Sequence, residues 1–231
     1  MSSPAERYAK SRQRAEAQKT LLHEFRRHRP FDLDDFQVRA CEALERGFGV
    51  LVAAPTGAGK TVVGEFAVYL ALQHGGKCFY TTPIKALSNQ KYRDLIEEYG
   101  EERIGLLTGD LSINGDAPIV IMTTEVLRNM IYAGSEALLG LMHVVMDEVH
   151  YLADRDRGAV WEEVILHLPD SVTVTALSAT VSNAEEFGDW LTTVRGDTTI
   201  IVEEHRPVPL WQHVAAGSRI YDLFSDDEQR E

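Results

Sequence analysis

The chain has 231 residues, 44% of them apolar and 26% charged, which is enough for one large α/β domain and typical of a globular protein. No segment is apolar enough to span a bilayer or act as a secretory signal, and two cysteines are too few for a disulfide framework or a structural metal site. We therefore expect a cytoplasmic protein without membrane contact or structural metal, and the net charge of −13 argues mildly against tight non-specific binding to nucleic acid.

The N-terminal residues differ from the rest of the chain in charge. Residues 1–29 carry eight Lys or Arg against three Glu, whereas the remainder carries 15 basic and 33 acidic residues. Because they contain few apolar residues, we expect residues 1–30 to form a basic, partly helical and solvated extension. A core-type pattern begins near Phe31, and Asp34 opens a helix that Gly47 ends.

From residue 50 onward, short apolar strands alternate with helices. This alternation predicts an α/β fold with a parallel sheet that is covered by helices on both faces. The expected strands are 50–54, 77–81, 104–107, 118–122, 142–146, 172–177 and 199–203. The expected helices are 61–74, 84–99, 124–132, 158–167 and 183–192. After residue 210 the pattern fades.

The first strand of this series runs into a glycine-bearing loop. A strand, a loop that ends in Gly-Lys-Thr, and a helix form the context of a phosphate-binding P-loop, although this loop opens with Ala rather than Gly. Two glycines let the backbone curl close to phosphates. The lysine supplies a charge for the β- and γ-phosphates, and the threonine hydroxyl can reach Mg²⁺. The loop comprises Ala54, Pro55, Thr56, Gly57, Ala58, Gly59, Lys60 and Thr61.

Five of the expected strands end in small, hydroxyl-bearing or acidic residues. Ligands bind at the carboxyl ends of strands in open parallel sheets, so we expect one composite site along this rim. Asp147 can hold Mg²⁺, and the adjacent Glu148 can polarise an attacking water. The strand ends are the P-loop, Thr81-Thr82-Pro83, Thr123-Thr124-Glu125, Asp147-Glu148-Val149-His150 and Ser178-Ala179-Thr180.

With these motifs in this order, the chain resembles the superfamily 2 DExH helicases. More finely, it resembles the superkiller-like RNA helicases and their bacterial HelY-type branch. The supporting segments are Thr81–Tyr92, Gly105–Asp110 and Met122–Met130, and the resemblance covers about residues 31–210. It implies a RecA-like P-loop domain that uses ATP with Mg²⁺ and holds a single nucleic-acid strand, RNA rather than DNA.

The resemblance also implies a role for each matching residue. Gln37 would contact adenine, and the P-loop residues would contact phosphates. Thr61 and Asp147 would hold Mg²⁺, with Lys60 and Glu148 as catalytic residues. His150 would couple the ATP site to the bound strand through Ser178 and Thr180. The residues that would line the single-strand path, holding its backbone without reading bases, are Pro83, Lys85, Thr108, Gly109, Thr124 and Glu125.

Each assignment has an alternative in the residues alone. Gln37 could be a solvated helix residue, Lys85 a surface lysine and His150 a core histidine. No residue settles whether the substrate is RNA or DNA, so a DNA helicase lobe stays open, as does a non-catalytic nucleotide-binding or partner-binding fragment. A P-loop kinase or G-protein is disfavoured by the Asp-Glu-Val-His and Ser-Ala-Thr motifs.

The resemblance also implies a second RecA-like lobe, and nothing in residues 211–231 matches it. We therefore expect residues 31–204 to form the first RecA-like domain and residues 205–231 the beginning of a linker to the second lobe. That lobe would supply arginines to the γ-phosphate, which are worth about 10³–10⁵ in rate. The chain alone should hydrolyse ATP slowly and should not unwind nucleic acid.

Overall fold

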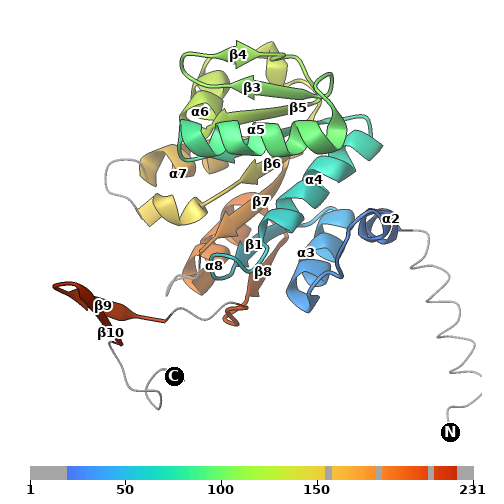
Figure 1. Ribbon diagram of the computed structural model, residues 1–231. Helices are drawn as coiled ribbons and strands as arrows, with labels where there is room; N and C mark the ends of the chain where they lie inside the picture. The colour runs from blue at the N-terminus through green and yellow to red at the C-terminus, as the bar shows by residue number, and fades with distance from the viewer. Residues whose placement is uncertain (1–19, 154–157, 180–183, 208–210, 223–231) are drawn as a thin grey trace, which may run out of the picture.

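The computed structural model describes residues 20–153, 158–179, 184–207 and 211–222 (Figure 1). Its centre is an eight-stranded sheet in the order β4-β3-β5-β2-β6-β7-β1-β8. Every neighbouring pair is parallel except β3 and β4, so the expected parallel sheet is confirmed with one antiparallel edge strand added. The strands are β1 (Gly49–Ala53), β2 (Lys77–Thr82), β3 (Ile104–Leu107), β4 (Ser112–Ile113), β5 (Ile119–Thr123), β6 (Leu141–Met146), β7 (Thr173–Ser178) and β8 (Thr198–Val202).

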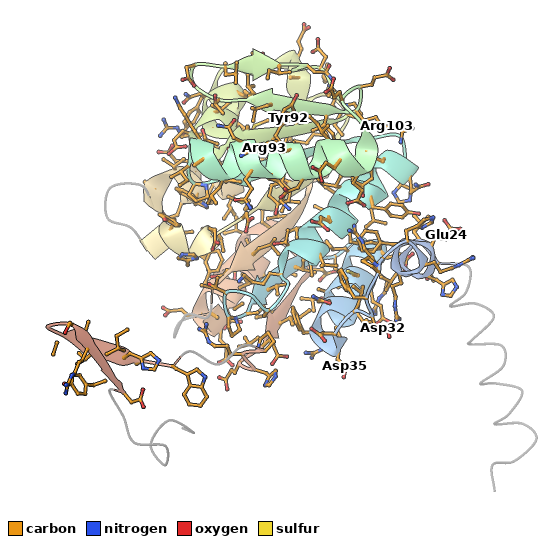
Figure 2. All side chains as sticks on the ribbon, viewed as in Figure 1. Glu24, Asp32, Asp35, Tyr92, Arg93 and Arg103 are labelled. Carbon is orange, nitrogen blue, oxygen red and sulfur yellow. The ribbon has the colours of Figure 1, made fainter. Side chains whose placement is uncertain are left out.

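Helices cover both faces of this sheet, and side chains fill the space between the layers (Figure 2). One apolar core joins the sheet to α2 (Leu21–Arg27), α3 (Asp35–Glu45), α4 (Thr61–Gln73) and α5 (Lys85–Tyr99). The other joins it to α6 (Thr124–Tyr132), α7 (Gly158–His167) and α8 (Ala184–Arg195), with the short 3₁₀ helices η1 (Glu136–Leu138) and η2 (Val149–Ala153). Within the described ranges, no helix combines the length and apolar character that crossing a bilayer requires.

The central strands are apolar at successive positions because both of their faces are buried. All five residues of β5 are buried, for example. On one face, α4 comes close to the sheet because Gly64 carries no side chain. A Cβ at Gly64 would lie 3.0 Å from both Tyr80 Cε2 on β2 and Val145 Cγ1 on β6. Gly64 thus makes room for the Tyr80 ring beneath the helix.

The N-terminal part of the packed structure begins earlier than the sequence pattern indicated. Leu22 and Phe25 of α2 are 5% and 2% exposed, and the Phe25 ring packs edge-on against Phe66 of α4 at a centroid distance of 5.1 Å. The expected solvated extension is therefore wrong for α2, because two apolar residues on one face suffice to anchor a short basic helix. Phe31, where the core was expected to begin, is 49% exposed. Residues 1–19 of the expected extension lie outside the described residues.

Replacing Phe25 with Ala is expected to lower the free energy of unfolding by about 3–5 kcal/mol, because it leaves a cavity between α2 and α4. Phe31→Ala is the matched control, and we expect it to change stability by less than about 0.5 kcal/mol because the side chain is half exposed. Urea denaturation followed by circular dichroism measures both. Equal effects would mean that α2 is not part of the cooperative core.

The C-terminal described segment forms a second, separate sheet. The strands β9 (His213–Ala216) and β10 (Arg219–Asp222) pair as an antiparallel hairpin, and all eight of their residues are exposed. In Figure 1 the hairpin lies apart from the large sheet. The sequence pattern had faded here, because strands that bury neither face show no apolar alternation.

Candidate functional site

The sheet order sorts the expected motifs into two groups. The adjacent strands β6, β7 and β1 end at the expected ATP-site residues, and the adjacent strands β3, β5 and β2 end at the expected nucleic-acid residues. The two groups meet where β2 pairs with β6. Because these strands run parallel, all of their carboxyl ends lie on one rim, as the sequence predicted.

The loop after β1 is shaped by two glycines. Gly57 and Gly59 have φ values of 87° and 81°, in the left-handed region that residues with side chains rarely adopt. The N–H of Ala54 donates to the carbonyl of Ser178 at 3.1 Å, which ties the loop to the end of β7. Helix α4 begins directly at Thr61, so its unsatisfied N–H groups and its dipole can face an anion held in the loop.

Lys60 folds back over this loop. Its Nζ donates to the carbonyl oxygens of Ala54 at 2.9 Å and Pro55 at 3.2 Å, and the residue is 9% exposed. Burial lowers the pKa of Lys60, whereas the charges of Glu148 and Asp147 act to raise it. A phosphate in the loop would offer the ammonium charge-assisted bonds in place of these neutral acceptors.

Strand β6 delivers two adjacent carboxylates to the rim. The Asp147 carboxylate is held at both oxygens: the Tyr80 hydroxyl donates to Oδ2 at 3.0 Å, and the Glu148 N–H donates to Oδ1 at 2.9 Å. The N–H of Asp147 itself donates to the carbonyl of Thr81 on β2 at 2.9 Å. Glu148 has a φ of 55°, a strained backbone for a residue other than glycine, which is common at functional sites.

Burial and hydrogen bonding act in opposite directions on the Asp147 carboxyl group. Burial raises its pKa above the ordinary value, while the bonds from Tyr80 and from the Glu148 N–H, and then the charges of Lys91 and Lys60, lower it. Burial also raises the pKa of Tyr80 well above its ordinary value, and the Asp147 charge adds to this effect. Tyr80 therefore keeps its proton and is the donor of the bond.

The carboxylates share a cavity with the beginning of α4. Thr61, Asp147 and Glu148 line a space of about 220 Å³, together with Lys91 of α5. The Thr61 hydroxyl and the Asp147 carboxylate are hard oxygen donors of the kind that Mg²⁺ prefers. The donor set therefore fits the expected metal, and Glu148 lies beside it where a water could enter.

His150 lies between the carboxylates and the end of β7. Its Nδ1 is 3.3 Å from Glu148 Oε2 and 3.4 Å from the N of Ala179, the residue after Ser178. One ring nitrogen cannot serve both neighbours at once: Nδ1 accepts from the Ala179 N–H when it carries no hydrogen, and it donates to Glu148 when it does. His150 therefore contacts this segment through the backbone of Ala179, and its expected coupling to Ser178 and Thr180 stays a prediction. Ser178 is buried, and Thr180 lies outside the described residues.

The Gln37 amide is 4% exposed and bonded within the protein at both ends. Its Oε1 accepts from the N–H of Asp34 at 2.9 Å, completing a capping box at the beginning of α3, and its Nε2 donates to the carbonyl of Gly59 at 3.0 Å. A Cβ at Gly59 would lie 2.6 Å from this Nε2. Gln37 joins α3 to the P-loop here, and its expected contact with adenine stays a prediction.

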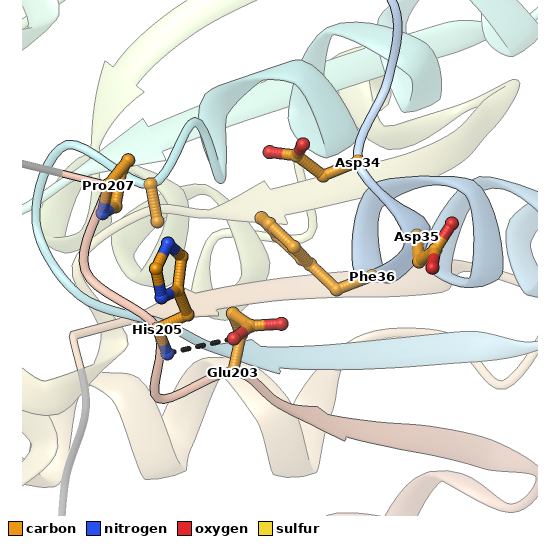
Figure 3. A pocket seen from close by; sticks show the side chains of 7 residues that line it. Asp34, Asp35, Phe36, Glu203, His205 and Pro207 are labelled. Atoms are coloured by element: carbon orange, nitrogen blue, oxygen red, sulfur yellow. Dashed lines mark hydrogen bonds between the residues drawn. The ribbon is translucent and has the colours of Figure 1, made fainter.

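A second cavity, of about 310 Å³, adjoins the same part of the P-loop (Figure 3). Phe36 at the beginning of α3 lies on one side, and His205 and Pro207, which follow β8, lie across from it. Ala58 of the P-loop and the carboxylates of Asp34, Asp35 and Glu203 complete the lining. The residues after β8 carry no sequence pattern that would mark the return of the chain to the P-loop.

The expected nucleic-acid residues also lie on the rim. Lys85 Nζ is 2.8 Å from Asp110 Oδ1, and the Thr108 hydroxyl donates to the same oxygen at 3.0 Å. The structure thus brings Lys85 to the loop of Thr108 and Gly109. Asp110 was not predicted as a site residue, and it occupies Lys85 with a carboxylate where a phosphate was expected.

The remaining expected nucleic-acid residues, Pro83, Thr124 and Glu125, follow the strands β2 and β5. The Thr124 hydroxyl donates to the Thr82 carbonyl at 3.4 Å, which joins the first turn of α6 to the end of β2. Glu125 follows in that turn and is half-buried, and Pro83 is buried. The strand ends on which the motifs lie are therefore connected to one another by hydrogen bonds.

Comparison with known proteins identifies this arrangement. The family model described as DEAD/DEAH box helicase matches residues 34–187. This chain belongs to the DEAD/DEAH box helicase family. The match includes the P-loop, the carboxylate pair and the segments that are expected to contact nucleic acid. The expected resemblance to superkiller-like helicases with a HelY-type branch is confirmed.

Individual helicases match most of this chain with a small part of their own length. The Probable helicase HelY of Mycobacterium leprae (strain TN) is 74% identical over 206 residues, which are 89% of this chain and 22% of that protein. The ATP-dependent RNA helicase mtr4 of Schizosaccharomyces pombe is 49% identical over 201 residues, 86% of this chain and 18% of that protein. The chain therefore spans about a fifth of the length of these curated relatives.

A solved helicase structure supports the fold. The Mycobacterium smegmatis helicase Lhr, bound to single-stranded DNA and AMP-PNP, superposes with a TM-score of 0.61 and 28% sequence identity, covering 75% of this chain and 27% of that chain. The expected RecA-like helicase fold is thereby confirmed.

Proposed function

We propose that this domain is the ATP-binding and ATP-hydrolysing lobe of a Mg²⁺-dependent helicase that moves along a single RNA strand. One observation carries this proposal: Thr61 at the end of the P-loop lines one small cavity together with the carboxylates of Asp147 and Glu148. A triphosphate in the loop would present its terminal phosphate to that cavity.

The residues have separate tasks in this mechanism. The P-loop N–H groups and the α4 N-terminus would bind the phosphates, with Lys60 moving its bonds from the loop carbonyls to the β- and γ-phosphates. Thr61 and Asp147 would hold Mg²⁺, which neutralises phosphate charge when it is bound. Glu148 would orient the attacking water and accept its proton. His150 would couple changes at Glu148 to the backbone segment beside Ser178.

The cavity beside Phe36 is the place that we propose for the base. The Phe36 ring and Pro207 offer apolar surface, and the carboxylates of Asp34 and Glu203 can accept bonds from the exocyclic amine of adenine. Guanine could donate its N1–H and 2-amino hydrogens to the same carboxylates, so the preference for ATP over GTP rests on the family resemblance rather than on this lining. Gln37 would support this cavity through its bond to the P-loop, in addition to the base contact that the family resemblance implies.

RNA is favoured over DNA by the relatives. The 49% identical mtr4 is named an RNA helicase. A DNA strand is the second candidate, because the more distant Lhr structure contains single-stranded DNA. The contacts proposed for this lobe are hydroxyls, backbone groups and one lysine, which hold phosphates and sugars without reading bases.

The curated relatives are several times longer than this chain. We propose that a second RecA-like lobe in the longer protein completes the ATP site and the strand path. The alternative hypothesis is a non-catalytic fragment that only binds nucleotide. ATP hydrolysis by the isolated chain would exclude this alternative.

ATP turnover by the 231-residue chain tests the proposal. We expect slow, Mg²⁺-dependent hydrolysis that single-stranded RNA stimulates more than DNA of the same sequence, because the 2′-hydroxyl distinguishes the two strands. Stronger stimulation by DNA would favour the second candidate. Binding of ATP without any turnover would mean that the chain is a nucleotide-binding module and not an ATPase.

A further inference from the structure

Tyr80 is a buried tyrosine whose hydroxyl reaches the rim. The residue is fully buried on β2, and its hydroxyl donates to Asp147 Oδ2 at 3.0 Å. A buried tyrosine hydroxyl usually finds a hydrogen-bond partner, and here that partner is the carboxylate that follows β6.

The surroundings hold the phenol ring in place. Gly64 leaves the space in which the ring lies against α4, although an interior glycine destabilises a helix relative to Ala. Lys91 Nζ lies 5.5 Å from the ring centroid, within the range of a cation–π contact.

The lysine over the ring is itself anchored. Lys91 Nζ is 3.2 Å from Glu65 Oε1, and the other oxygen of Glu65 is 3.0 Å from Arg29 Nη1. Lys91 and Glu65 are nearly buried. A chain of contacts therefore runs from the Asp147 carboxylate after β6, through Tyr80 and Lys91, to Glu65 of α4 and Arg29 after α2.

We propose that Tyr80 is a positioning residue of the nucleotide site, and that its hydroxyl fixes the orientation in which Asp147 presents its carboxylate to Mg²⁺. This inference rests on the proposed assignment of Asp147 to the metal. With donors on both oxygens, the carboxylate cannot rotate, and each oxygen keeps a lone pair for the metal or for its bound water. Without the phenol, only the Glu148 N–H would hold the group.

Tyr80→Phe removes one oxygen atom and leaves the ring in place. The matched control is Tyr99→Phe, which removes a phenol hydroxyl at the far end of α5. The measurement is the affinity of the 231-residue chain for fluorescent mant-AMP-PNP, in EDTA and over a series of Mg²⁺ concentrations. We expect Tyr80→Phe to need about tenfold more Mg²⁺ for the half-maximal gain in affinity, since removing partners that orient metal ligands costs about 10- to 100-fold. The affinity in EDTA should stay unchanged.

A double substitution separates positioning from general support of the fold. In the Asp147→Asn background, adding Tyr80→Phe should cause no further change in the Mg²⁺ midpoint, because the two residues act through one carboxylate. If Tyr80 is only a core residue, Tyr80→Phe will weaken binding equally with and without Mg²⁺.

The possible failures can be told apart. A wild-type midpoint in Tyr80→Phe, or an equal loss of affinity in EDTA, would overturn the inference while leaving the proposed function standing. The absence of any Mg²⁺-dependent binding in the wild-type chain would overturn the proposed function and the inference with it.

Discussion

Glu148→Gln is expected to reduce ATP turnover by about 10²–10⁴-fold, the usual contribution of a general base, while leaving ATP affinity nearly unchanged. The amide has almost the same shape as the carboxylate but cannot take a proton from water. The strained backbone at Glu148 and its bond to Asp147 involve only main-chain atoms of this residue, so the substitution should not disturb them. Single-turnover hydrolysis and equilibrium binding of mant-ATP measure the two quantities separately.

Glu136→Gln on η1 is the matched control, because it changes the same functional group at an exposed position away from the rim. It should leave both quantities unchanged. Undiminished turnover in Glu148→Gln would remove Glu148 from the mechanism and would point to another group as the base.

Lys60→Ala is expected to weaken nucleotide binding by about 10- to 100-fold, the equivalent of one hydrogen bond to a charged group, about 1.5–3 kcal/mol. The substitution also removes the positive charge beside Asp147 and Glu148, so phosphate would meet two carboxylates without a neutralising neighbour. Isothermal titration with AMP-PNP and Mg²⁺ measures the affinity directly.

Lys77→Ala provides the control for this substitution. Lys77 lies at the opposite end of β2 from the rim, where its Nζ donates to the carbonyl of Ala137 at 3.3 Å. Its loss should not alter nucleotide affinity. Wild-type affinity in Lys60→Ala would mean that the backbone of the P-loop alone provides the binding.

Most elements of the fold could be predicted from the sequence because the strands are buried on both faces. The helix expected at 61–74 is Thr61–Gln73, and the strand expected at 172–177 is Thr173–Ser178. The strand order could not be predicted, since apolar runs do not say which strand lies beside which. The two-residue strand β4 is exposed and leaves no apolar signal at all.

Only part of the candidate site could likewise be predicted from the sequence. Residues in sequence motifs, such as Lys60 and Asp147, could be named because glycine spacing and strand ends mark them. Tyr80, Lys91 and Asp110 could not, because their roles depend on contacts between distant segments: Tyr80 and Asp147 are 67 positions apart. The positive φ of Glu148 also had no local signal, since no glycine marks the position.

The pairing of β2 with β6 has a mechanical consequence. Two hydrogen bonds cross that pairing close to the rim, from the Asp147 N–H to the Thr81 carbonyl at 2.9 Å and from the Thr81 hydroxyl to the Val145 carbonyl at 3.1 Å. The strand ends proposed for the nucleotide and those proposed for the nucleic acid are therefore parts of one rigid sheet. Such a sheet would move as a rigid body. In the proposed helicase, movement would then occur between this sheet and a neighbouring domain rather than within the sheet.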